Sequence, residues 1–249
     1  MVEDRPLQAP PQAQELNPEA ERRRPPANLE FPLIRTKIQI PRRRAELLGR
    51  SRLVGRLHSS IDRKLVILSA PAGYGKTSLL VDFACETDLP VCWLTLDAIN
   101  RDLRIFMEYF IAALAARYPA FGAKSRLFLK QTVNLSQNLY GLSAVVTQEI
   151  HEAIPEYFVL ILDDFHTVDT QDSIAEFLDL FITYVDENCH LVIASRNLVA
   201  LPNLVLLIAR RQAVGLSADE LRFTRMEIQD FVRNNFALEL PDKAANALI

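Results

Sequence analysis

The sequence predicts an α/β protein with a three-layer sandwich around a parallel sheet, followed by the start of a small helical domain. Two observations predict this class. Short apolar runs alternate with helix-like stretches from about residue 51 to 200, and this order builds parallel βαβ units. A loop containing Gly73 and Gly75 also joins the first apolar run directly to a helix. With 249 residues, 49% of them hydrophobic, the chain is long enough for one large domain and a smaller appendage.

Each element is predicted from the spacing of its apolar residues, which is near two or continuous in strands and 3.6 in helices. The predicted strands are 65–68, 91–96, 157–162 and 190–194. The predicted helices are 51–61, 76–84, 103–116, most of 123–154, 173–185, 204–210, 226–236 and one that begins at 241. Trp93, inside the second strand, is expected in the core.

Composition divides the chain into three parts. Residues 1–30 hold six of the 14 prolines and few aliphatic residues, which predicts a disordered or loosely docked arm. Residues 31–200 form the predicted α/β domain, and residues 201–249 begin a helical domain. Because residue 249 falls inside a predicted helix, we expect the chain to be cut from something longer.

The loop after the first predicted strand reads Ala70-Pro-Ala-Gly-Tyr-Gly-Lys-Thr77, the pattern of a P-loop, with Ala70 where Gly is commoner. Its glycines let backbone N–H groups approach phosphate oxygens. Lys76 carries a positive charge to the β- and γ-phosphates, and the Thr77 hydroxyl ligates Mg²⁺. The sequence therefore predicts nucleotide binding. The loop residues expected to contact the nucleotide are Ala72, Gly73, Tyr74, Gly75, Lys76, Thr77 and Ser78.

Two acidic residues and one arginine follow later strands. Asp163 is predicted to hold the Mg²⁺ and Asp164 to orient or deprotonate the attacking water, although a surface turn also explains an Asp-Asp pair. Arg196 follows the fourth strand, at the carboxyl edge where ligands bind in open α/β sheets. We expect it to contact the γ-phosphate, the alternative being a surface arginine that caps a loop. His166 follows the acidic pair and could line the same edge, but a structural role is the favoured interpretation.

Charge and composition limit the classes of binding partner that the sequence predicts. The net charge of −3 divides into +6 for residues 1–64 and −9 for residues 65–249. The arginine clusters 22–24 and 42–44 allow a nucleic-acid hypothesis, but they lack interleaved aromatic residues. A solvated or intramolecular role is favoured, and no specific DNA binding is expected from this chain.

Compartment and redox state are also predicted. No apolar run approaches the ~20 residues of a membrane span, and the first residues lack a signal segment. We therefore expect a cytoplasmic protein with no membrane partner. The three cysteines have no close spacing and are interpreted as buried, reduced thiols.

Several of these pieces together resemble the MalT-like branch of the STAND class of signal-transduction ATPases, over residues 33–249. The pieces are Thr36-Lys37, Leu48–Leu53, Ser69–Ser78, Trp93–Asp97, Leu160–His166, Ser195-Arg196 and Leu216–Thr224. The resemblance implies a nucleotide-binding domain followed by a helical domain, a winged helix, a repeat-built sensor and often a LuxR-type helix-turn-helix effector. Asn100-Arg101-Asp102 departs from a more acidic run, and the chain ends before the winged helix.

The resemblance also assigns roles to residues. It implies that Lys76 and Thr77 serve ATP or ADP and Mg²⁺, Asp163 the metal and Arg196 the γ-phosphate. The Leu48-Gly49-Arg50 stretch would lie beside the adenine, so that Leu48 and Arg50 are expected at the nucleotide.

Two functions follow from these observations. In the first, ATP binding drives activation or nucleotide-dependent self-assembly, and slow Mg²⁺-dependent hydrolysis resets the switch. In the second, a turnover ATPase or kinase, phosphoryl transfer is itself the output. No second substrate site is evident in the sequence, and Arg210 and Arg211 are the candidate arginine fingers. The switch is the favoured hypothesis.

Overall fold

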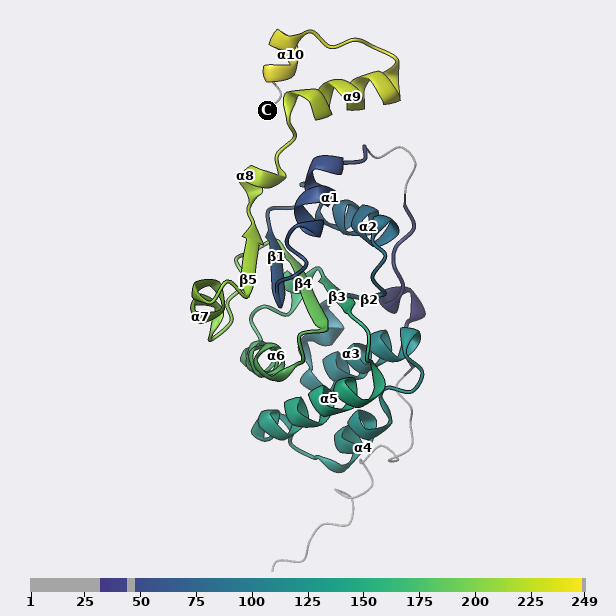
Figure 1. Cartoon of the computed structure of the whole chain (residues 1–249), viewed down its shortest axis with the longest axis vertical. Coiled ribbons are helices and arrows are strands. Elements are labelled where there is room, and N and C mark those ends of the chain that lie inside the picture. The colour runs from purple at the N-terminus through teal and green to yellow at the C-terminus, as the bar shows by residue number, and fades with distance from the viewer. Residues whose placement is uncertain (1–31, 44–47, 248–249) are drawn as a thin grey trace, which may run out of the picture. The chain divides into compact units, whose positions relative to one another are not determined.

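A computed structural model describes residues 32–43 and 48–247 of the chain. The predicted arm at residues 1–30, including the arginine cluster 22–24, lies outside the described residues. Within them, five parallel strands form one sheet in the order β2-β3-β4-β1-β5, with helices on both faces (Figure 1). This is the predicted α/β class.

The strands are short and mostly buried, as parallel strands covered on both faces must be. They are β1 (Leu65–Ser69), β2 (Val91–Thr95), β3 (Phe158–Asp163), β4 (Cys189–Ser195) and β5 (Ala213–Leu216). Every residue of β3 and β4 is buried. The four predicted strands thus lie within a residue or so of their expected bounds.

The helices come between the strands and after them. The α-helices are α1 (Ser51–His58), α2 (Lys76–Glu86), α3 (Leu103–Arg117), α4 (Ala123–Gln131), α5 (Leu139–Ala153), α6 (Asp172–Tyr184), α7 (Leu204–Ala209), α8 (Ala218–Leu221), α9 (Arg225–Phe236) and α10 (Asp242–Asn246). Short 3₁₀ turns are η2 (Arg35–Ile38), η3 (Ala98–Arg101), η4 (Leu135–Gln137) and η5 (Phe165–Thr167).

Each face of the sheet has its own core. Apolar residues of α1 and α2 pack against one face, where Trp93 is buried as predicted. Helices α3, α5 and α6 lie on the other side (Figure 1). There the rings of Phe110 on α3 and Phe177 on α6 meet edge to face at 5.5 Å, a favoured aromatic geometry.

Strand β5 was not expected from the sequence. Ala213 to Leu216 pairs with β1 and extends the sheet beyond residue 200, where the predicted helical domain begins. Only Ala213 and Leu216 of the strand are buried, and it contains Gly215, so its apolar pattern is weak. Pairing with β1 makes it a strand, which is a tertiary effect.

The parallel register places the carboxyl ends of the strands at one edge of the sheet. Ser69 lies opposite Ser195, and Thr95 lies opposite Asp163. The loop that follows β1 and the residues that follow β3 and β4 therefore meet at this edge, as the βαβ prediction requires.

The prediction of three buried thiols is wrong at one position. Cys92 and Cys189 are buried free thiols as expected, but Cys85 is exposed, because its position on α2 faces away from the sheet core. Among the described residues, no helix is long and apolar enough to cross a membrane.

Candidate functional site

The loop between β1 and α2 has the backbone of a phosphate-binding loop. Gly73 and Gly75 have φ of 89° and 73°, in the left-handed region that glycine adopts most easily. Gly75 is the N-cap of α2, and the first helical bond runs from the Leu79 N–H to the Gly75 carbonyl at 2.9 Å. The N–H groups of the first turn therefore lack partners within the helix and form an anion-binding end.

Lys76 is held by its own loop. Its Nζ donates to the carbonyl oxygens of Ala70 at 2.6 Å and Pro71 at 3.0 Å, and the residue is 8% exposed. Burial lowers the pKa of the ammonium, while Asp163 and Asp164 act in the opposite direction. An ammonium has three N–H donors, so these two bonds leave one for a phosphate oxygen.

Thr77 and Asp163 are directly hydrogen-bonded. The Thr77 Oγ1 donates to Asp163 Oδ2 at 2.8 Å, and the Asp164 N–H donates to Oδ1 at 3.0 Å. Asp163 is 2% exposed, and burial raises its pKa to about 6 against the opposing effect of the Thr77 bond. The two predicted metal ligands therefore stand side by side, and both offer oxygen, which Mg²⁺ prefers.

Asp164 and Arg196 lie at the rim of the same edge. Asp164 has a φ of 56°, unusual for a residue other than glycine, and its carboxyl is 39% exposed. The Nδ1 of His166 lies 3.7 Å from Asp164 Oδ1, beyond hydrogen-bond distance. Arg196 is exposed, and among the described residues no hydrogen bond or ion pair of its guanidinium is found.

A cavity of about 440 Å³ brings most of the predicted residues together. Those that line it are Leu48, Arg50, Ala72, Gly73, Gly75, Lys76, Thr77, Ser78, Asp164 and Arg196. Two predicted residues do not line it. Tyr74 packs against the core beneath the loop, and Asp163 lies behind Thr77.

Four further lining residues were missed by the sequence analysis. They are Leu79 and Asp82 on α2, Phe223 before α9, and Phe231 on α9. The two phenylalanines come from a segment about 150 residues away along the chain, and no local motif marks them. Asp82 is paired with Arg43 Nε at 2.6 Å, so this member of the 42–44 cluster has an intramolecular partner.

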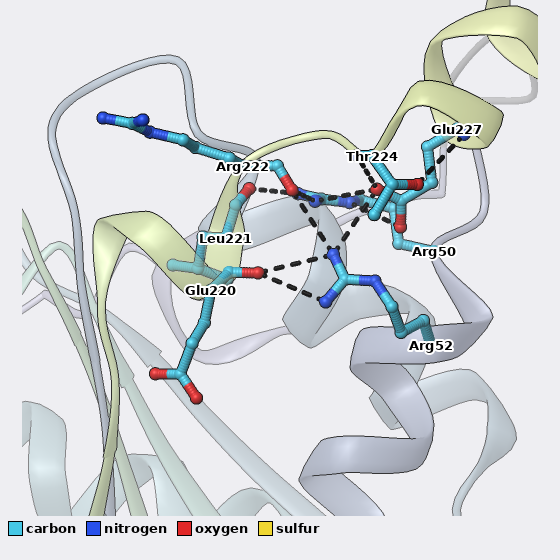
Figure 2. Close-up of polar contacts among 7 residues, drawn as sticks. All are labelled: Arg50, Arg52, Glu220, Leu221, Arg222, Thr224 and Glu227. Carbon is cyan, nitrogen blue, oxygen red and sulfur yellow. Dashed lines mark hydrogen bonds and ion pairs between the residues drawn. The ribbon is translucent and has the colours of Figure 1, made fainter. Parts of the chain in front are cut away.

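Arg50 lines the cavity, but its guanidinium is already bonded to protein. Nη1 donates to the Leu221 carbonyl and Nη2 to the Arg222 carbonyl, both at 2.7 Å (Figure 2). Nη2 also lies 3.3 Å from Glu227 Oε2. Arg50 therefore lines the cavity and also holds the C-terminal segment, a role that the sequence did not indicate.

Fold and loop define a P-loop nucleotide-binding module. No protein-family model matches the chain. Two curated relatives are the HTH-type transcriptional regulators MalT of Yersinia pestis (strain Pestoides F) and Serratia proteamaculans (strain 568). Each is 31% identical to this chain over 80% of its length, and the chain spans about 21% of each relative. Over the matched residues, the chain is therefore a P-loop module similar to one part of the MalT regulators.

Two solved structures are similar to parts of this chain. The Walker-type ATPase of Pyrococcus abyssi is 15% identical, with a TM-score of 0.44 over 83% of this chain and 63% of that chain. The Orc1 protein of Aeropyrum pernix in complex with DNA is 16% identical, with a TM-score of 0.46 over 76% and 49%.

The burial of Asp163 predicts a cost in stability. The pKa of Asp163 is raised to about 6 in the folded protein, so the protonated carboxyl contributes to stability. This contribution is fully present below the unfolded pKa of 3.8 and is lost as pH rises through about 6. We expect Asp163→Asn to raise the free energy of unfolding by about 1–3 kcal/mol above pH 6, with a smaller gain near pH 4. Urea denaturation across this range tests it, with the exposed Asp62→Asn as control. A wild type that is more stable than Asp163→Asn at pH 7 would contradict the prediction.

Proposed function

We propose that this chain is the ATP- and ADP-binding switch module of a STAND signal-transduction ATPase. ATP binding drives activation or assembly, and slow hydrolysis resets the module. The observation that carries the proposal is the shared cavity: Lys76, the N-terminal turn of α2 and Arg196 border one hollow of about 440 Å³. That volume falls within the range of small-ligand sites.

The polar part of the cavity suits a chain of phosphates. The loop offers N–H groups at the helix N-terminus and a buried ammonium, both of which favour anions. Arg196 adds a guanidinium that has no protein partner among the described residues. Phosphates bind through such charge-assisted hydrogen bonds, each contributing on the order of 1.5–3 kcal/mol.

Magnesium fits the Thr77 and Asp163 oxygens. Among the described residues no group of three His, Cys, Asp or Glu residues converges on one point. Two protein oxygens fill only part of an octahedral shell, so phosphate oxygens and water would complete it. The ion, when bound, neutralises phosphate charge. We therefore expect Mg²⁺ and nucleotide to bind together, the Thr77 hydroxyl turning from Asp163 to the metal.

The apolar part of the cavity suits a base. Leu48, Leu79, Phe223 and Phe231 supply aliphatic and aromatic surface at the same hollow. Aromatic side chains stack on nucleic-acid bases of any identity, so this wall supports a nucleoside rather than a bare phosphate. The assignment of adenine rests on the likeness to the MalT regulators.

The switch requires a group that distinguishes ATP from ADP. Because the γ-phosphate is the only difference between the two, a residue that binds it shifts the balance of states. Arg196 is that residue in our proposal, and Asp164 orients the attacking water. Its short side chain, partly exposed at the rim, is a poor general base. Slow hydrolysis suits a switch better than a turnover ATPase.

The likeness to MalT also bears on the whole protein. Those relatives are named as HTH-type transcriptional regulators, and this chain spans about a fifth of their length. We propose that the module works within a longer regulator whose winged-helix, sensor and effector domains supply signal and output. Self-assembly in the ATP state and a cytoplasmic location belong to the same proposal.

The phosphate site predicts the effect of losing Lys76. We expect Lys76→Ala to weaken Mg·ATP about ten- to a hundredfold, because one charge-assisted contact is lost from the phosphates. Calorimetric titration measures it. Lys130→Ala, which removes an exposed lysine of α4, is the matched control and should bind like wild type. Equal affinity in wild type and Lys76→Ala would refute the phosphate-loop assignment.

The switch predicts a selective effect at Arg196. We expect Arg196→Ala to weaken ATP by about 1–3 kcal/mol more than ADP, since only ATP presents a γ-phosphate. The exposed Arg117→Ala on α3 controls for the loss of charge. Calorimetric titration of ATP and ADP measures this difference in affinity. The turnover rate is a second test, and we expect it to lie far below the ~1–100 s⁻¹ of an ordinary kinase. Equal weakening of both nucleotides, or rapid unaided turnover, would favour the turnover ATPase.

A further inference from the structure

The Arg50 guanidinium holds the start of α9 against the start of α1. It is 5% exposed and makes the two 2.7 Å bonds to the carbonyls of Leu221 and Arg222 (Figure 2). Its central carbon also lies 4.4 Å from the centroid of the Phe223 ring, a cation–π contact. One side chain from residue 50 thus fixes three consecutive residues of a distant segment.

Glu227 also takes part in these contacts between Arg50 and the segment 221–224, which together we call the Arg50 joint. Its Oε2 accepts from the Thr224 N–H at 2.8 Å, and its own N–H donates to Thr224 Oγ1 at 3.2 Å, which is a capping box. The same carboxylate pairs with Arg50 at 3.3 Å. Although burial acts to raise its pKa, the Thr224 N–H and Arg50 outweigh it and keep the pKa of Glu227 below its usual value. The cap of α9 and the Arg50 joint therefore share one charged group.

The joint holds Phe223 at the nucleotide cavity. Phe223 and Phe231 line the cavity together with Leu48, two residues before Arg50. Phe223 is 38% exposed, so neighbouring residues cover only part of it. A ring in such a place is free to turn away unless something fixes its backbone and one of its faces. Arg50 does both, through the carbonyls of the two preceding residues and the cation–π contact.

Resting on the proposed nucleotide site, we propose that Arg50 is a positioning residue that holds Phe223 as the contact surface for the base of the nucleotide. The phosphate groups are bound without its help, by the loop at Lys76. Base-bearing ligands therefore depend on Arg50, and ligands that consist of phosphate alone do not. The base, rather than the phosphate chain, is then the part of the ligand that links the sheet to the α9 segment.

Titration of Mg·ATP and Mg·tripolyphosphate into the whole chain tests this. Arg50→Gln keeps an N–H donor but loses the charge and the forked geometry. We expect it to weaken ATP by about tenfold or more while tripolyphosphate stays within about twofold. The matched control is Arg52→Gln. Arg52 contacts the Glu220 and Arg222 carbonyls at 3.3–3.4 Å but is 46% exposed and does not line the cavity. It should change both ligands less than about threefold.

A second variant keeps the test sound if Arg50→Gln folds poorly. Phe223→Leu leaves the Arg50 charge network intact and should weaken ATP about tenfold with tripolyphosphate unchanged. The double variant should then weaken ATP no more than the stronger single variant, because both changes remove the same contact.

Three results would overturn the proposal. These are equal weakening of both ligands by Arg50→Gln, no effect of Phe223→Leu on ATP, and fully additive effects in the double variant. Each leaves the nucleotide site itself standing, since wild type still binds ATP. A wild type that binds neither ligand would refute the proposed function and this inference together.

Discussion

The hydrogen bond from Thr77 Oγ1 to Asp163 Oδ2 joins the two elements on which the site depends. Thr77 stands in the first turn of α2, and Asp163 ends β3, with β4 between β3 and β1 in the sheet. The bond is possible because parallel strands end at one edge, so that β1 and β3 deliver their following residues to the same place. It also holds a carboxylate in a buried position that is unfavourable for its charge. Buried carboxylates with a shifted pKa are typical of functional sites.

A second constraint is that the residues lining the cavity come from distant parts of the sequence. Its phosphate side is built from one continuous loop, whereas its apolar side needs residues near 48 and near 223–231 to come together. Arg50 makes that meeting through carbonyls, a carboxylate and a ring. A ligand that touches both sides of the cavity would therefore report on the position of α9. The contacts of Arg50 thus provide a physical route from a ligand in the cavity to α9.

The sequence could predict what local pattern determines. The strands β1 to β4, their intervening helices and the P-loop follow from apolar spacing and from glycines that the structure finds at positive φ. Contacts between residues that are distant in the sequence could not be predicted from local pattern. Strand β5 pairs with β1, which is more than 140 residues earlier in the sequence, and Phe223 lines the cavity with its ring against Arg50, also far from it in the sequence. Asn100, noted as a departure in sequence, is buried and accepts from Lys37 Nζ at 2.5 Å, a partner 63 residues away.

Hydrogen exchange with and without Mg·ADP tests the account most directly. The central claim is that one nucleotide contacts both the loop and the α9 segment. It predicts slower amide exchange in residues 72–79 and, in the same experiment, in residues 221–231, while α4 on the far side of the sheet is unchanged. Protection confined to the loop would contradict the joined cavity, and no protection anywhere would contradict nucleotide binding itself.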